Sequence, residues 1–186
     1  MKRLSTVLTV LTVLTVALAL LVIAASAAAE APPPSPPGRT QVLSAAREVM
    51  RQAQLCTLVT LDEGGQPQAR VMDPAEPDPD FVVWIATNSK SRKVAQLARE
   101  PRAALSYFDR ATMSYVTLLG SATLVSDAEL KVRHWQPKWA PFYPQGAKTS
   151  NLLLIRFVPR RLEIVSAPHK LTGDTPDWRP VSVDFR

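Results

Sequence analysis

Cysteine is almost absent from this chain, since Cys56 is the only one among 186 residues. An internal disulfide is therefore excluded, although disulfides are common in exported proteins. Cys56 lies within the apolar run 55–59, and no neighbouring residue in the sequence would lower the pKa of its thiol. We interpret it as a small buried hydrophobic residue rather than a nucleophile.

The sequence motifs of the common catalytic classes are also missing. There is no glycine-rich phosphate loop, no HExxH, no CxxC and no serine in a nucleophile elbow. His134 is expected to face solvent from a helix, and His169 to lie exposed in the C-terminal tail, so both are weak candidates for metal ligands. The acids of 73–80 are interpreted as a solvated loop, and neither a metal site nor a catalytic residue is assigned.

A strong excess of one charge is missing too. The formal net charge of +6 falls to about +4 once Lys2 and Arg3 are removed. The basic residues are scattered and form no stripe. We therefore expect no nucleic-acid partner.

The first 29 residues predict export to the periplasm or the medium. A basic start is followed by an apolar run over 4–25 and by small residues at 27–29, which together are typical of a cleaved signal peptide. The apolar run is nearly long enough to span a bilayer, so an uncleaved membrane anchor over 1–29 is the alternative. Residues 30–39 are rich in proline and predict an extended linker.

The rest of the chain predicts a mainly β domain over 40–166 and a tail over 167–186. Thr40 is expected to cap an amphipathic helix over 41–53, and 126–129 has the form of a capping box for a short helix. Strands are expected at 55–61, 68–72, 81–86, 103–108, 113–125 with a bend at Gly120, and as a pair around Pro159, at 151–158 and 160–166. The hairpin-like succession favours an antiparallel barrel over a parallel sheet.

A polar corner follows the apolar strand at 81–86. The stretch 87–93 leads into a helix that stops at Pro101. Such a corner brings hydroxyls, the free N–H groups of a helix N-terminus and the cations of Arg92 and Lys93 to one point, which suits a phosphate group. On local sequence alone, a capped helix with a solvated Arg-Lys pair is the simpler interpretation.

Four stretches, in order over roughly 41–166, resemble a known family. They are CTLVTLDEGGQPQARVM, WIATNSKSRKVAQLAREPRAALSYFD, YVTLLGSATLVSD, and WQPKWAPFYPQG before LLLIRFVPRRLEIV. They resemble the FMN-binding split barrels related to pyridoxamine 5′-phosphate oxidase, most closely the general stress protein branch. The resemblance implies a six-stranded antiparallel split β-barrel with flanking helices, and a homodimer with two flavin sites at the subunit interface.

The resemblance also implies which residues bind the cofactor. In such families the arginine of an R-x-M strand and an S-R-K corner hold the flavin phosphate, which implies Arg70, Ser91, Arg92 and Lys93. Backbone around Val71, Met72, Ala86 and Thr87 would line the ring and the ribityl chain. Tyr115, Trp139 or Phe142 would reach the partner's site, with a core position as the alternative for each.

The implied function is flavin-dependent oxidoreductase activity with FMN on an unknown small substrate or electron donor. The alternatives are a non-catalytic flavin-binding or stress-response module, and the same fold with a deazaflavin or with haem, for which His169 would be a ligand. Two departures argue against pyridoxamine phosphate oxidation itself. Tyr115 takes the place of a family glutamine, and the tail lacks the oxidase's Trp and Arg pattern apart from a partial match at 178–180.

Overall fold

The computed structural model describes residues 37–172 and 179–185. The predicted export segment over 1–29 lies outside these residues, as does most of the proline-rich linker. Within the described part of the chain, no helix is long and apolar enough to cross a bilayer.

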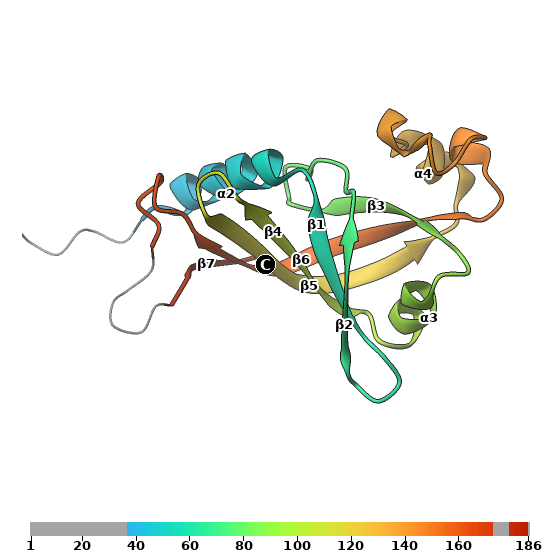
Figure 1. Ribbon diagram of the computed structural model, residues 1–186, viewed down its shortest axis with the longest axis horizontal. Coiled ribbons are helices and arrows are strands. Elements are labelled where there is room, and N and C mark those ends of the chain that lie inside the picture. Colours follow the sequence, from blue (N-terminus) through green and yellow to red (C-terminus); the bar gives the residue numbers. More distant parts are fainter. Residues whose placement is uncertain (1–36, 173–178, 186) are drawn as a thin grey trace, which may run out of the picture. The chain divides into compact units, whose positions relative to one another are not determined.

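The described residues form one antiparallel sheet, with α2 packed along it and the shorter helices near its other end (Figure 1). The strands are β1 (Cys56–Leu61), β2 (Pro67–Met72), β3 (Val83–Asn88), β4 (Arg102–Asp109), β5 (Ser114–Val125), β6 (Leu152–Val165) and β7 (Val181–Asp184). The helices are α2 (Arg39–Ala53), α3 (Arg92–Arg99) and α4 (Ala128–Arg133), with the 3₁₀ turns η1 (Pro137–Trp139) and η2 (Gly146–Lys148). The sheet order is β2-β1-β4-β5-β6-β3, and β7 pairs with β6. The mainly β split-barrel fold is confirmed.

The predicted strand pair around Pro159 is wrong, because β6 runs unbroken from Leu152 to Val165. Its first half pairs with β3 and its second half with β7, while β5 follows it along the other side. Pro159 falls between the residues that pair with β3 and those that pair with β7. A proline is tolerated there because neither β3 nor β7 pairs with this position, and β5 meets it where its own register shifts.

The predicted bend at Gly120 is confirmed as a β-bulge. The register between β5 and β6 shifts at Leu119 and Gly120, with Gly120 opposite Pro159. A Cβ atom at position 120 would lie 2.1 Å from the Val158 carbonyl oxygen. Only glycine therefore allows the two backbones to approach this closely.

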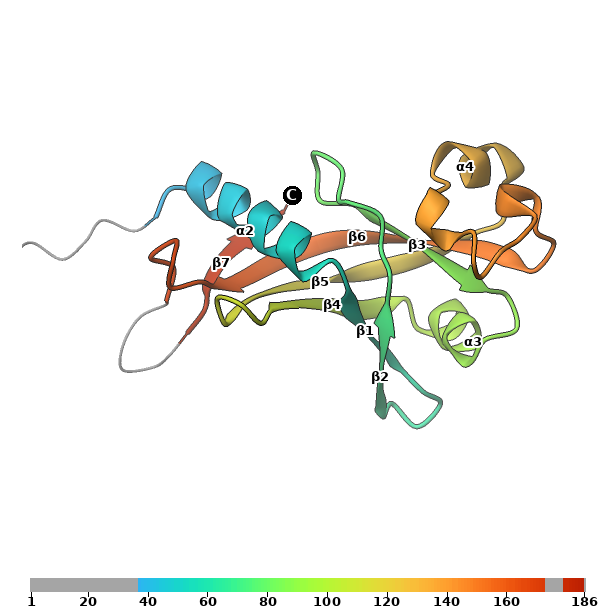
Figure 2. The ribbon, with the colours of Figure 1, turned by 45° about the horizontal axis from the view of Figure 1, so that its top comes forward.

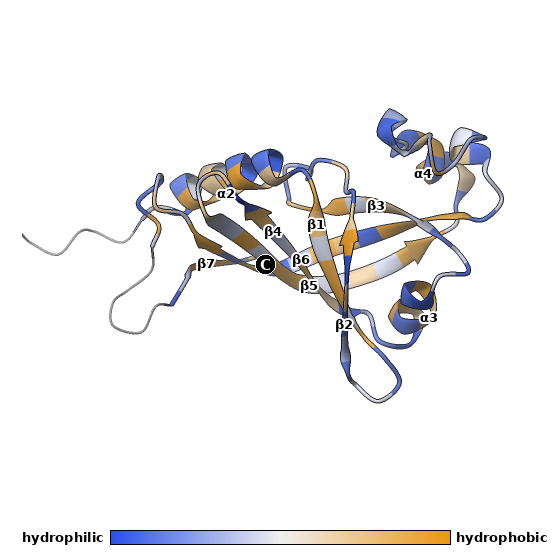
Figure 3. Cartoon of the chain, in the orientation of Figure 1, coloured by the Kyte–Doolittle hydropathy of each residue, from blue (hydrophilic) through white to orange (hydrophobic). Residues whose placement is uncertain are grey.

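The core lies between the curved sheet and α2, which contacts β4, β5 and β7 (Figure 2). Hydrophobic and hydrophilic residues alternate along α2 (Figure 3), and its buried face is Val42, Ala45, Ala46, Val49 and Met50. The predicted cap at Thr40 is wrong. The helix begins at Arg39 after Gly38, and no side chain caps it.

The 73–80 segment is more ordered than the predicted solvated loop. Pro74 bridges to Ile85, and Ala75 is buried. Arg47 of α2 donates hydrogen bonds of 2.7–3.0 Å to the carbonyls of residues 77–79. The Arg47 guanidinium also lies 4.1 Å from the centroid of the Phe81 ring. The half-buried Arg47 thus holds one end of a loop that carries four acids in the sequence.

The start of one strand and the cap of one helix differ from the prediction. The third strand runs over 83–88 rather than 81–86, because Phe81 has a positive φ of 63° and cannot continue a strand. The capping residue of α4 is Asp127 rather than Ser126, since the Asp127 carboxylate accepts from the Leu130 N–H at 2.8 Å.

The C-terminal segment contributes to the sheet and the core. No strand is predicted after residue 166, yet β7 pairs with β6. Leu171 is fully buried, and Val183 is 7% exposed in the same cluster. Because this segment has only four strand residues, its apolar pattern was too short to predict it.

Candidate functional site

Three cations converge where β2 meets the start of α3. Arg70 lies on β2, and Arg92 and Lys93 open α3; we call these three residues the cation cluster. The Arg70 guanidinium donates to the Gln96 side-chain oxygen at 3.0 Å and also to the Thr60 hydroxyl. Because Thr60 and Gln96 are both buried, they fix the guanidinium from its inner side.

The cations of this cluster raise one another's electrostatic energy. Partial burial, and then the charge of Arg92, lowers the pKa of Arg70. Partial burial, and then the charge of Arg70, lowers the pKa of Lys93. None of the three forms an ion pair within 37–172 or 179–185. A bound anion would relieve this repulsion, so the cluster suits a multiply charged group such as a phosphate.

Hydroxyl and backbone donors lie beside the cluster. Lys93 Nζ is 3.2 Å from the Thr87 hydroxyl, which is in turn 3.3 Å from the Ser91 hydroxyl. Ser91 is the N-cap of α3, and its side chain makes no capping bond. The first N–H groups of a helix have no intrahelical acceptor, so Ser91 and the helix start add donors to the positive charge.

An apolar pocket of about 400 Å³ adjoins these donors. We call it the site pocket; it is lined by Leu55, Val71, Met72, Asp73, Ala86, Thr87, Asn88, Lys93, Trp139, Phe142 and Tyr143. Two adjacent walls come from the ends of β2 and β3, and the aromatic residues come from the turns around η1. A positively charged end and an apolar body are therefore combined in one site.

The structure brings most of the predicted residues together. Val71, Met72, Ala86 and Thr87 all line the site pocket beside Lys93. Ser91 contacts the pocket residue Thr87, and Arg70 is close enough to Lys93 to lower its pKa. Arg92 does not line the site pocket and instead lines a neighbouring pocket beside Gln96.

The three predicted aromatic residues differ in their position relative to the site pocket. Trp139 lines the site pocket but is only 2% exposed, and its indole N–H donates to the Asp73 carbonyl at 2.9 Å. It is both a core residue and part of the wall. Phe142 lines the same pocket and is 75% exposed. Tyr115 lies on β5 opposite Phe108 and Val165, and it is not among the residues that line the site pocket.

The supporting residues Thr60 and Gln96 were missed by the sequence analysis. Gln96 is buried beside Leu97 on α3, and the two residues together form the inner face of that helix. A polar residue at a buried helical position is the signal that could have revealed it. Thr60 carries no such signal, because threonine is ordinary in a strand.

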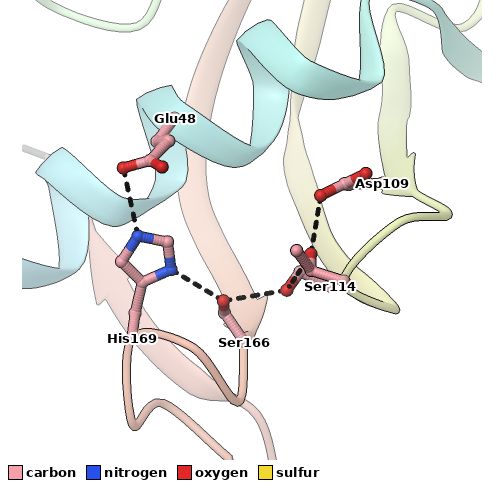
Figure 4. A network of polar contacts seen from close by, with 6 residues as sticks. Glu48, Asp109, Ser114, Ser166 and His169 are labelled. Atoms are coloured by element: carbon pink, nitrogen blue, oxygen red, sulfur yellow. Dashed lines mark hydrogen bonds and ion pairs between the residues drawn. The ribbon is translucent and has the colours of Figure 1, made fainter.

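The prediction that His169 lies exposed and alone is wrong. Its Nδ1 is 2.8 Å from the Ser166 hydroxyl, and its Nε2 is 3.2 Å from the Glu48 carboxylate of α2 (Figure 4). The buried hydroxyls of Ser166 and Ser114 are 2.8 Å apart and extend this network. The network ties the C-terminal segment to α2 and to the start of β5.

His134 also differs from the prediction that it faces solvent. Its ring stacks on Trp84 with the centroids 3.8 Å apart. Partial burial, and then the charges of Arg133 and Arg156, lowers the pKa of His134, against a weaker opposite effect of Asp78. The neutral ring is thus part of the packing around β3.

Comparison with known proteins identifies the family. Residues 42–172 match the family model described as "Pyridoxamine 5'-phosphate oxidase like". No curated protein gives a significant match.

Solved structures share the fold at low sequence identity. A protein related to general stress protein 26, of the pyridoxinephosphate oxidase family, from Clostridium acetobutylicum has a TM-score of 0.65 and 17% identity, over 78% of this chain and 94% of that chain. General stress protein 26 from Bacillus anthracis has a TM-score of 0.62 and 17% identity, over 78% and 99%. A heme binding protein from Mycobacterium smegmatis has a TM-score of 0.57 and 19% identity, over 81% and 60%.

The structural matches agree with the architecture described above, and the family model spans most of the chain. The chain therefore belongs to the pyridoxamine 5′-phosphate oxidase-like family.

Proposed function

We propose that this chain binds FMN and acts as a flavin-dependent oxidoreductase on a small substrate. The cation cluster and Ser91 would hold the phosphate, and the site pocket would hold the ring. The observation that carries the proposal is the convergence of three cations, without an ion-pair partner among the described residues, beside an apolar pocket. Membership of a family known for FMN binding supports it.

The residues present fit the two parts of this cofactor. A phosphomonoester carries nearly two negative charges and is held best by a guanidinium fork, an ammonium and helix N-terminal amides. The isoalloxazine ring is flat and largely apolar, which suits the walls formed by Val71 and Ala86.

The chain's own residues supply binding and orientation. Arg70 is held in place by Thr60 and Gln96, so its fork is fixed before an anion arrives. Thr87 positions the Lys93 ammonium at 3.2 Å. When bound, FMN supplies the redox chemistry through its ring.

Haem is the weaker alternative for this chain. One structural relative is a heme binding protein, and His169 is the predicted ligand. Both ring nitrogens of His169 already have partners, Ser166 and Glu48. Ligation of iron would therefore break one of these contacts, whereas no cation of the cluster has an ion-pair partner among the described residues to displace.

Titration of the purified protein with FMN, followed by visible absorption, tests the proposal. We expect tight binding in the wild type and a loss of more than tenfold for Arg92→Ala combined with Lys93→Ala, because each charge-assisted contact contributes about 1.5–3 kcal/mol. Arg110→Ala combined with Arg133→Ala removes the same charge at exposed positions and should bind as the wild type. Absence of a titratable flavin band in the wild type would refute the cofactor assignment.

Gln96→Glu tests the cluster without removing a cation. Its new carboxylate would lie about where the amide oxygen lies, 3.0 Å from the Arg70 guanidinium, and would compete with phosphate. We expect FMN binding to weaken by about tenfold. Gln52→Glu, on the exposed side of α2, should have no effect. Equal affinities for the two variants would place the phosphate elsewhere.

A turnover assay distinguishes a flavin-dependent enzyme from a module that only binds flavin. Reduction of the bound FMN by a nicotinamide donor or an envelope electron carrier supports the oxidoreductase. Flavin that binds tightly and is reduced by none of them supports the non-catalytic module.

We further propose that the protein is a homodimer and that it is exported. The apolar side chains exposed around the site pocket support the dimer. The sequence of residues 1–29 supports export, and the mass of the protein isolated from its own cell envelope would reveal whether this segment is removed.

A further inference from the structure

We infer that a second pocket, of about 520 Å³ between the end of α2 and the 73–77 segment, binds a small apolar monocarboxylate. It is lined by Arg47, Met50, Arg51, Gln54, Leu55, Asp73, Pro74, Ala75, Glu76, Pro77, Tyr107 and Lys138, and we call it the α2 pocket. It shares only Leu55 and Asp73 with the site pocket. The inference does not depend on flavin binding.

The walls of the α2 pocket are held in place by two of its three cations. Arg47 donates to the three carbonyls of residues 77–79. Lys138 forms an ion pair with Asp73 and donates to the Pro74 carbonyl at 2.6 Å. Both ends of the 73–79 segment are therefore held in place. The cavity is thus formed before a ligand enters.

Arg51 is the cation that remains for a ligand. It is exposed on the last turn of α2, and it has no hydrogen-bond or ion-pair partner in 37–172 or 179–185. The lining side chains carry three positive and two negative charges, so the pocket has a net charge of about +1. A guanidinium fork matches a carboxylate, while Met50, Leu55 and Ala75 provide apolar surface for the rest of the ligand.

Tyr107 places a buried polar group in the wall of the pocket. It lines the pocket from β4 and is 2% exposed, and its hydroxyl has no well-formed hydrogen bond within the described residues. The Cys56 thiol beside it is only a weak partner. Since an unsatisfied buried hydroxyl is costly, a ligand with a hydroxyl group opposite its carboxylate would gain affinity here.

Isothermal titration of the full chain with benzoate, benzylamine and the hydroxybenzoates tests the inference. We expect benzoate to bind and benzylamine to bind more weakly. Arg51→Gln should weaken benzoate binding by about tenfold, and Glu76→Gln should tighten it a few fold by removing the competing charge at the rim. At least one hydroxybenzoate should bind more tightly than benzoate, and Tyr107→Phe should abolish that gain.

Arg110→Gln makes the same charge change on an exposed turn away from the pocket and should leave benzoate binding unchanged. Saturating FMN should also leave it unchanged, because the two pockets share only Leu55 and Asp73 and the cation cluster does not line the α2 pocket. The inference is overturned if benzoate does not bind, if Arg51→Gln binds it as the wild type does, or if FMN displaces it. A hydroxybenzoate gain that survives in Tyr107→Phe would likewise overturn the role of Tyr107.

Discussion

Arg70 illustrates how a functional side chain depends on residues of ordinary appearance. Its guanidinium is held by Thr60 from the neighbouring strand and by Gln96 from α3. The convergence of Arg70 with Arg92 and Lys93 was predicted only through the family resemblance, since no local pattern pairs a strand arginine with a helix start. Thr60 and Gln96 could not be predicted, because their role exists only once β1, β2 and α3 meet.

Cys56 makes the stability of this fold sensitive to alkaline pH. Burial raises the pKa of its thiol from 9.0 to about 12. Between these values the unfolded chain loses a proton that the folded chain keeps, so the free energy of unfolding falls as pH rises, by at most about 1.4 kcal/mol per pH unit. Burial also raises the pKa of Tyr107, which acts in the same direction above its ordinary value of 10.0.

Urea unfolding of the wild type and of Cys56→Ala between pH 8 and pH 11 measures this contribution. We expect the variant to lose stability less steeply above pH 9, because the thiol is gone and the raised pKa values of Tyr107 and Tyr143 act only above about pH 10. Reaction of the thiol with a disulfide reagent should be very slow in the native protein and fast in urea. Parallel pH profiles for the two proteins would contradict the assignment.

At the scale of the elements, local patterns predicted most strands but not their continuity. The alternation of apolar residues in β1, β4 and β5 is visible in the sequence, and these strands formed as expected. Pro159 suggested a break in β6, because the sequence does not reveal that β3 and β7 both leave this position unpaired while β5 continues past it. The ordered 73–80 segment was missed for the same reason, since Arg47 binds it from α2.

We predict that Gly120 of β5 cannot be replaced by alanine without a large loss of stability. In Gly120→Ala the new methyl group would meet the Val158 carbonyl oxygen at 2.1 Å, so β5 and β6 must separate. We expect a loss of about 3 kcal/mol in the free energy of unfolding, measured with urea. Gly64→Ala is the control, because its nearest neighbour would be 3.6 Å away, and it should change stability by less than about 0.5 kcal/mol. Similar losses for both would contradict the bulge argument.

At the scale of the whole molecule, the exposed apolar residues around the site pocket predict a second copy of the chain. Leu55 is 49%, Val71 66% and Phe142 75% exposed. Side chains of this kind beside a ligand site are costly in water and are commonly covered by a partner. A dimer would also close the site pocket from the side that the single chain leaves open.

Val71→Asp is therefore expected to convert the dimer to a monomer and to weaken FMN binding, as measured by sedimentation equilibrium and flavin titration. A buried carboxylate at the interface would be left without a partner. Val132→Asp on α4 is the matched control, since Val132 is 61% exposed and lines neither the site pocket nor the α2 pocket. A wild type that sediments as a monomer would contradict the dimer directly.

The pairing of β3 with β6 also determines when the site pocket can form during folding. β3 ends at Asn88, but β6, the strand that pairs along it, begins only at Leu152. A ribosome or a translocation channel that delivers the chain from its N-terminus releases Ala86 and Thr87 long before the strand that orders them. Closing so long a loop is slow. We therefore expect the site pocket to form late in folding, so that a chain exported unfolded would have to acquire its cofactor after synthesis and transport are complete.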